Sequence, residues 1–246
     1  MKIKTETYIN ILPYFFQKLE LENVNYAVLR GFENLPESYS NDIDFGVLKK
    51  NLPLFIKIIK SIAERYSYIL KLRDLRLDVL KLSLSSNNDN IDIDIWSSFN
   101  YVGLYYLDYE NILNDYTYYN GFKILKPENE LALSYLKELL HMNRLREDKV
   151  KKLQKKLDSP FQIPLQEYFT LPLIDEFISS IKLEQFKLDN LAKKSKMVLL
   201  KKNILKRGLW RTILSVFKFI IVRLNRRNKI KKMEELIFLG NYTIAK

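Results

Sequence analysis

Residues 26–47, YAVLRGFENLPESYSNDIDFGV, decide the fold of this chain. An apolar run at their start predicts a strand that ends at Gly31, and a turn-rich segment follows it. A second strand-like run then carries Asp42 and Asp44 in alternation with apolar residues. Because residues two apart in a strand point to the same face, both carboxylates are expected on one face, with their Cα atoms about 6–7 Å apart.

Carboxylates at this spacing can hold one or two hard divalent cations and orient phosphate oxygens. A glycine at the end of the preceding strand lets the backbone approach a phosphate closely. An isolated Asp-x-Asp is, however, also common on a solvated strand face. The pattern therefore needs support from elsewhere in the chain.

A later acidic strand, Ile91–Trp96, gives that support. It alternates in the same way and carries Asp92 and Asp94. Strand-like segments at 66–72 and 76–84 precede it, with Arg73-Asp74 expected at the turn between them. A polar turn at 85–90 then predicts a hairpin that brings the acidic strand beside the Asp-x-Asp strand.

This arrangement of Gly31, Asp42-Ile43-Asp44 and Asp94 resembles the DNA-polymerase-β-like nucleotidyltransferase superfamily over roughly residues 20–150. Within it, the chain is similar to a bacterial group associated with cell-surface polysaccharide synthesis. The segments that carry this second similarity are Leu29–Phe32, Leu35-Pro36, Asn41–Asp44, Ile93–Trp96 and the helix start at Pro127–Glu130. The resemblance implies an α+β (α/β-like) fold, with a mixed sheet flanked by helices and a helical basic C-terminal region after it.

The resemblance also implies site residues. Asp42, Asp44 and Asp94 would be catalytic and would bind Mg²⁺ or Mn²⁺, while Asp92 would be an exposed carboxylate near the strand end. Contacts to donor phosphates would come from Arg30 and Gly31, and from Lys137 or Arg144 on a helix whose alternative role is a solvated face. The activity implied is transfer of a nucleotidyl or related phosphoryl-linked group from a nucleotide donor to a hydroxyl of a sugar, glycan or other envelope precursor.

One position departs from the superfamily pattern. A small residue usually follows the glycine, and this chain has Phe32. Phe32 favours an alternative function, in which the scaffold is a catalytically inactive adaptor that docks on a membrane or a partner.

Composition narrows the chemistry further. The chain of 246 residues has no cysteine and one histidine, His141. Disulfides, thiolate metal sites and multi-histidine sites are therefore excluded. A bound metal would need oxygen ligands, which favours Mg²⁺ or Mn²⁺ over Zn²⁺.

The positive charge is concentrated near the C-terminus. Fifteen Lys/Arg and no Asp/Glu lie between Leu191 and Lys232, and residues 191–246 carry +14, so residues 1–190 carry 12 − 14 = −2. Prolines at 160 and 164 predict a domain boundary between 1–158 and 159–246. Such a tail indicates an anionic partner.

A helix in this tail is expected to lie in a membrane interface. Apolar residues share one helical face, with basic residues largely opposite: Trp210, Ile213, Leu214, Phe217, Ile221 and Leu224 against Arg211, Lys218 and Arg226. About 1 kcal/mol per basic residue near an anionic surface would hold the protein there. Packing against the body or a partner protein is the alternative, and nucleic acid is disfavoured because aromatic and basic residues are not interleaved. With no signal peptide or bilayer-spanning run, we expect a cytoplasmic protein, peripheral on the inner membrane face.

Overall fold

The computed structural model describes residues 6–36, 42–86, 90–155, 157, 160, 163–226, 228 and 230. The chain forms two compact units, each assembled from separate segments. The first contains residues 1–98, 113–125 and 221–246, and the second contains residues 99–112 and 126–220. The boundary predicted at 158/159 falls within the second unit, in a stretch that is only partly described, and it stays a prediction.

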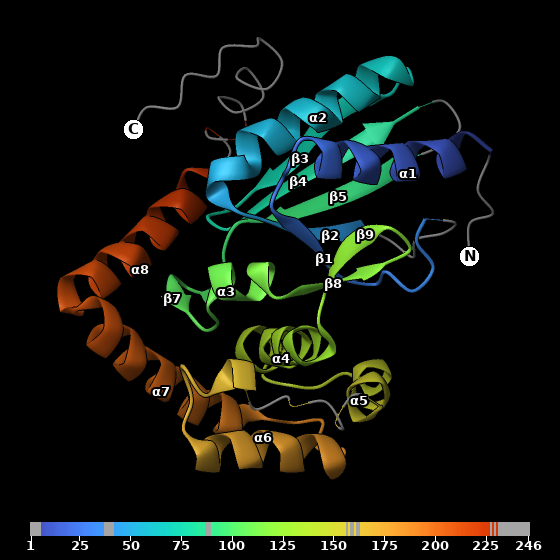
Figure 1. The fold of residues 1–246 in the computed structure, drawn as a ribbon. Coiled ribbons are helices and arrows are strands. Elements are labelled where there is room, and N and C mark those ends of the chain that lie inside the picture. The colour runs from blue at the N-terminus through green and yellow to red at the C-terminus, as the bar shows by residue number, and fades with distance from the viewer. Residues whose placement is uncertain are drawn as a thin grey trace. The chain divides into compact units, whose positions relative to one another are not determined.

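The first unit is built on a mixed sheet of seven strands in the order β3-β4-β5-β2-β1-β9-β8 (Figure 1). Strand β2 runs parallel to β5 and β1 runs parallel to β9, whereas the other neighbouring pairs are antiparallel. The strands are β1 (Tyr26–Arg30), β2 (Asp42–Val47), β3 (Ile69–Leu75), β4 (Val79–Ser85), β5 (Asn90–Trp96), β8 (Tyr116–Tyr119) and β9 (Phe122–Leu125). This mixed α/β architecture confirms the expected sheet flanked by helices.

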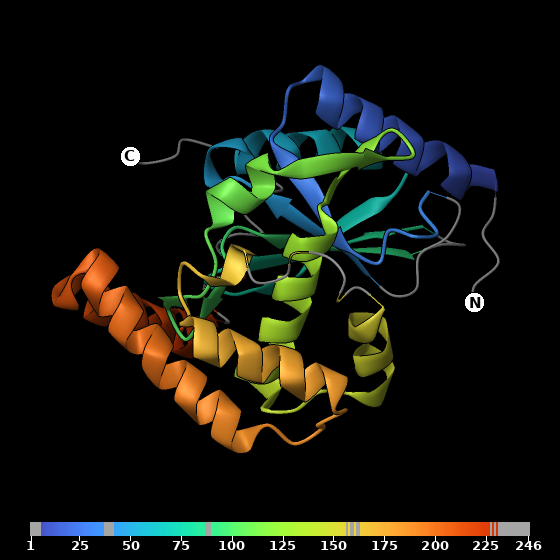
Figure 2. The same cartoon turned by 60° about the horizontal axis from the view of Figure 1, so that its bottom comes forward.

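Two helices cover one face of this sheet. Helices α1 (Glu6–Leu21) and α2 (Leu52–Arg65) lie side by side on this face, with α2 toward β3 and α1 toward β9 (Figures 1 and 2). The alternating residues of β2 explain the arrangement, since Ile43, Phe45 and Val47 are buried in the core with the apolar residues of both helices. The ring of Phe45 lies 5.5 Å from that of Phe15 and 5.2 Å from that of Phe55.

Sequence alternation predicted most of these elements, with two differences. Arg73 and Asp74 were expected in a turn but lie inside β3, and the chain turns at residues 76–78 instead. Strands β8 and β9 were not predicted, because tyrosines dominate the segment and two of the four β8 residues are exposed. Asn120 and Gly121, both with positive φ, form the turn between these two strands.

The second unit is mainly helical. Its elements are the short strands β6 (Asn100–Tyr101) and β7 (Leu104–Tyr105) and the helices α4 (Pro127–Lys137), α5 (Glu147–Gln154), α6 (Leu171–Lys182) and α7 (Asp189–Arg207). Helix α8 (Leu209–Leu224) begins after Gly208, and α3 (Tyr109–Asn114) and α8 each have residues in both units. A π-helical turn, Glu138–Met142, follows α4, and short 3₁₀ turns lie at Lys49–Asn51 and Ile163–Leu165.

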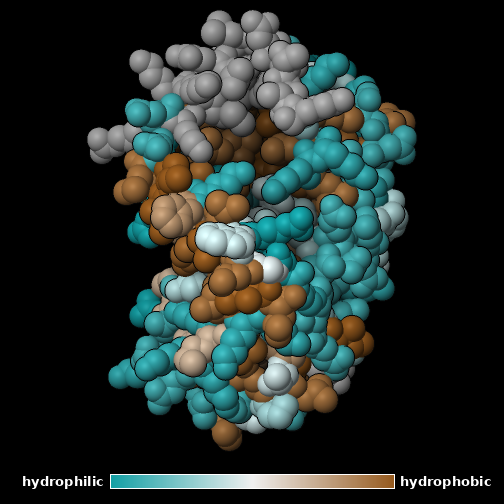
Figure 3. Space-filling view, turned by 90° about the vertical axis from the view of Figure 1, so that its left-hand side faces the viewer, coloured by the Kyte–Doolittle hydropathy of each residue, from teal (hydrophilic) through white to brown (hydrophobic). Residues whose placement is uncertain are grey.

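Aromatic packing and a buried amide hold this unit together. The Tyr135 and Phe177 rings lie 5.2 Å apart, which joins α4 to α6. The Asn203 side chain pairs with the backbone of Tyr105, with its Nδ2 donating to the carbonyl at 2.8 Å and its Oδ1 accepting from the N–H at 3.0 Å. The side of the molecule where α7 and α8 lie in Figure 1 faces the viewer in Figure 3, where hydrophobic patches alternate with hydrophilic ones.

Candidate functional site

The predicted carboxylates lie together on the sheet face opposite α1 and α2. Strands β2 and β5 are parallel neighbours, with Asp42 opposite Asp92 and Asp44 opposite Asp94. Asp44 and Asp94 are each only 3% exposed, whereas Asp42 and Asp92 are partly exposed. The acidic strand therefore lies beside the Asp-x-Asp strand, as the sequence predicted, and its other edge pairs with β4 in the predicted hairpin.

Both oxygens of Asp44 accept hydrogen bonds. Arg30 Nε donates to Oδ2 at 2.6 Å and Trp96 Nε1 donates to Oδ1 at 2.8 Å. Burial lowers the pKa of the Arg30 guanidinium, but the charge and hydrogen bond of Asp44 outweigh that effect and raise its pKa above the ordinary value. Arg30 is therefore a permanent cation at the end of β1.

Asp94 is also held between cations. Lys81 Nζ pairs with its Oδ2, and Arg73 reaches its Oδ1 at 3.3 Å while bonding Asp92 at 3.0 Å. Burial raises the pKa of the Asp94 carboxyl above its ordinary value, Lys81 opposes that shift, and the charges of Asp42 and Asp44 add to it. We call the set Arg30, Asp42, Asp44, Arg73, Lys81, Asp92 and Asp94 the carboxylate face.

Two β-bulges build this face. In β1, the pairing shifts between Val28, opposite Phe45, and Arg30, opposite Asp44. In β3 it shifts between Leu72, opposite Leu82, and Asp74, opposite Lys81. Each bulge adds one residue, so the side chain that follows it changes sides of the sheet. Arg30 and Asp74 therefore point to the carboxylate face rather than into the core.

Gly31 directly follows Arg30 and has φ +69°, a conformation that only glycine adopts without strain. A Cβ added there would meet no heavy atom within 4 Å, so the space beside it is open. Phe32 is 9% exposed and its ring lies 5.4 Å from that of Tyr119. The departure from the superfamily pattern is thus a core residue that leaves the Gly31 backbone accessible.

Lys137, the remaining predicted site residue, ends α4 in the second unit. Its assignment to a phosphate contact stays a prediction. His141, also in this unit, lies edge-on to Tyr101 with ring centroids 5.3 Å apart. Asp78 is buried in the turn before β4, where its backbone carbonyl accepts a hydrogen bond from the Ser97 N–H.

The sequence did not predict three of the residues that contact Asp44, Asp92 or Asp94: Arg73, Lys81 and Trp96. Lys81 was within reach of prediction, because a hairpin that pairs Ser85 with Asn90 necessarily pairs Lys81 with Asp94. Trp96 lies two residues beyond Asp94 and so on the same face. Arg73 follows the core residue Leu72, so alternation places it on the opposite face, but the sequence predicted a turn at this position instead of a strand.

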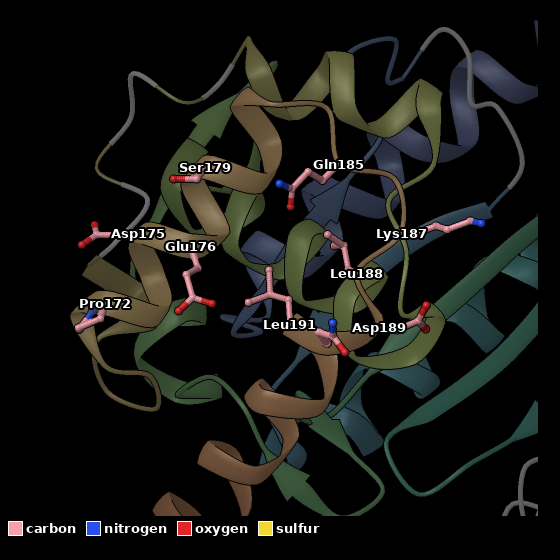
Figure 4. Close-up of a pocket in the computed structure, with 10 residues that line it drawn as sticks. Pro172, Asp175, Glu176, Ser179, Gln185, Lys187, Leu188, Asp189 and Leu191 are labelled. Carbon is pink, nitrogen blue, oxygen red and sulfur yellow. The ribbon is translucent and has the colours of Figure 1, made fainter.

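The second unit has a hollow between α6 and the start of α7, lined by Asp175, Glu176 and Asp189 among others (Figure 4). Glu176 is ion-paired with Lys194. None of the predicted site residues lines this hollow, and its residues form no nucleophile–base arrangement.

The candidate ligands on the carboxylate face suit a hard divalent ion. They are carboxylate oxygens, which Mg²⁺ and Mn²⁺ prefer. Asp42 has no hydrogen bond or ion pair with the described residues, so it is available as a ligand. In the described part of the chain, no three acidic or histidine side chains converge closely enough to hold a metal as they stand. An ion shared with Asp44 and Asp94 would therefore have to replace contacts made by Arg30, Arg73 or Lys81.

Comparison with known proteins gives no match: no protein-family model matches the sequence, and no curated protein is significantly similar to it.

Proposed function

We propose that the first unit is a nucleotidyltransferase-type domain and that the protein is a metal-dependent transferase. It would move a nucleotidyl or related phosphoryl-linked group from a nucleotide to a hydroxyl of a sugar, glycan or other envelope precursor. One observation carries the proposal: Asp42, Asp44 and Asp94 share one face of two neighbouring parallel strands, beside Arg30. The resemblance of the Gly31, Asp42-x-Asp44 and Asp94 pattern to that superfamily supports it.

The chemistry requires positioning and charge neutralisation rather than a histidine or cysteine. Asp42, Asp44 and Asp94 would hold Mg²⁺ or Mn²⁺, which would neutralise charge on the donor phosphates. Arg30 has five N–H donors, and its bond to Asp44 uses only Nε. The other donors would bind phosphate oxygens, so Arg30 links the donor to the carboxylates.

Gly31 and Asp94 would have separate tasks. The open space at Gly31 would let its backbone approach the donor phosphates. Asp94 would give up its contact with either Lys81 or Arg73 and accept the proton of the acceptor hydroxyl at a carboxylate oxygen, while the other of these two cations holds the carboxylate in place.

Isothermal titration calorimetry of the full chain with nucleoside triphosphates and Mg²⁺ tests the proposal. Asp42→Asn is the sharpest variant, because Asp42 makes no hydrogen bond or ion pair with the described residues and its replacement should leave the fold intact. We expect at least one nucleotide to bind only with Mg²⁺, and about tenfold weaker to Asp42→Asn. Asp175→Asn, in the exposed hollow of the second unit, is the matched control and should bind like the wild type.

A second candidate function is the inactive adaptor. It is favoured because all four carboxylate oxygens of Asp44 and Asp94 already have a partner. The partners are Arg30, Trp96, Arg73 and Lys81. On this account the carboxylate face is a structural ion-pair network. Absence of nucleotide binding by both wild type and Asp42→Asn would favour the adaptor and contradict the transferase.

A further inference from the structure

Helix α8 leaves its most apolar side in solvent. At about 100° per residue, its large apolar side chains occupy a stripe about 140° wide. Its most exposed members are Leu224 at 78%, Trp210 at 76% and Leu214 at 64%. We call this set the α8 stripe: Leu209, Trp210, Ile213, Leu214, Phe217, Ile220, Ile221 and Leu224.

The opposite side of α8 accounts for its attachment to the second unit. The backbone of Ser215 and Val216 lies so close to Gly103 that a Cβ there would be 2.5 Å from the Ser215 carbonyl oxygen. Arg207 also donates a hydrogen bond to Ser215 Oγ at 3.0 Å. The α8 stripe is therefore not the side that fastens the helix, and the described residues of this unit leave it uncovered.

The surroundings of the stripe are cationic. From Asn190 to Arg226 the sequence has eleven Lys/Arg and no Asp/Glu. On the helical projection, Arg211 and Lys218 border one edge of the stripe and Arg223 borders the other. These three side chains are exposed and form no ion pair with the described residues, unlike Lys194 and Lys206 on α7, which pair with Glu176 and Glu167.

We propose that α8 docks on an anionic lipid surface, lying in the plane of the interface with the α8 stripe among the acyl chains. The basic residues at both edges are placed to reach lipid phosphates while their stems stay beside apolar neighbours. Trp210, near the start of the helix, has an amphipathic ring suited to the headgroup level. Charge complementarity favours lipid over a second copy, since two α8 helices would bring their unpaired cations together.

The length of α8 fits this orientation. Its 16 residues span about 24 Å at 1.5 Å per residue, and the described part of the chain has no helix long and apolar enough to cross a membrane. The proposal is independent of the transferase activity, because it uses none of the carboxylate face.

Flotation of the full chain with vesicles tests the docking. One vesicle preparation is phosphatidylcholine alone, and the other contains about one third phosphatidylserine. We expect at least about tenfold stronger partitioning to the anionic vesicles, falling steeply with added salt. Equal binding to both preparations, or no salt dependence, would overturn the charge part of the proposal.

Substitutions on α8, compared with substitutions of equally exposed residues at α6, test whether the α8 stripe is the surface that binds lipid. Leu214→Ser with Phe217→Ser should lower partitioning about tenfold or more without changing the circular dichroism spectrum, because both side chains are exposed. Leu183→Ser removes an equally exposed leucine, 69% exposed at the end of α6, and should bind like the wild type. Lys218→Glu should weaken binding more than Lys182→Glu, on the exposed side of α6.

Tryptophan fluorescence provides a second readout. The chain has two tryptophans, Trp96 on β5 and Trp210 on α8. Brominated acyl chains should quench the emission of the wild type, and Trp210→Phe should remove that quenching. Wild-type emission that the brominated chains do not quench would overturn the proposal. A wild-type dimer that does not bind vesicles, and that Leu214→Ser with Phe217→Ser converts to a monomer, would show instead that a protein covers the α8 stripe.

Discussion

The two faces of the seven-stranded sheet differ in chemistry, although the same alternating strands build both. On one face, Phe45 and its neighbours pack against α1 and α2 in an aromatic core. On the other, Arg30, Lys81 and Arg73 pair with Asp44, Asp92 and Asp94. The apolar face can account for folding, which leaves the carboxylate face free to carry chemistry. The predictions below test this division, beginning with the largest effect.

Truncation of the apolar face should have the largest effect on stability. Phe45→Ala removes a fully buried ring, and we expect it to lower the free energy of unfolding by about 4 kcal/mol. Asp42→Asn, on the opposite face of the same strand, should change it by less than about 0.5 kcal/mol. Chemical denaturation measures both, and similar losses in the two variants would contradict the division between faces.

Breaking an ion pair on the carboxylate face should have an intermediate effect. Lys81→Met leaves the buried Asp94 carboxylate with only Arg73, and we expect a loss of about 2 kcal/mol. Adding Asp94→Leu should recover part of that loss, because the unpaired buried charge is gone.

Lys71→Met is the control for this change. Lys71 is exposed on β3 and forms no ion pair with the described residues, so its replacement should be nearly neutral. A Lys81→Met variant as stable as Lys71→Met would show that the pair adds nothing to the fold.

Alanine substitutions at two glycines with positive φ should have a small effect on stability. Comparing them separates the cost of backbone strain from a loss of nucleotide binding. Gly31→Ala and Gly121→Ala each place a side chain at positive φ in open space, and each should cost about 1 kcal/mol. Only Gly31→Ala should also weaken nucleotide binding, because only Gly31 borders Arg30. Equal nucleotide affinity for the two variants would remove Gly31 from the proposed site.

The sequence predicted the carboxylate face better than it predicted what pairs with it. Strict alternation in β2 and β5 placed Asp44 and Asp94 on one side, and the two strands are parallel neighbours, as the sequence predicted for their proximity. The position of Arg30 depends on a bulge, which breaks alternation without leaving a pattern in the sequence. The parallel pairing of β9 with β1 joins segments about a hundred residues apart, and local patterns do not predict such contacts.

The most direct test of the central claim is Mn²⁺ binding, followed by electron paramagnetic resonance of the free ion. Mn²⁺ prefers the same oxygen ligands as Mg²⁺ and reports binding without any assumption about the nucleotide. We predict that the wild type binds Mn²⁺, that Asp42→Asn binds it about tenfold more weakly, and that Asp175→Asn binds it like the wild type. Equal Mn²⁺ affinity for wild type and Asp42→Asn, or no binding by either, would contradict the proposed metal site on the carboxylate face.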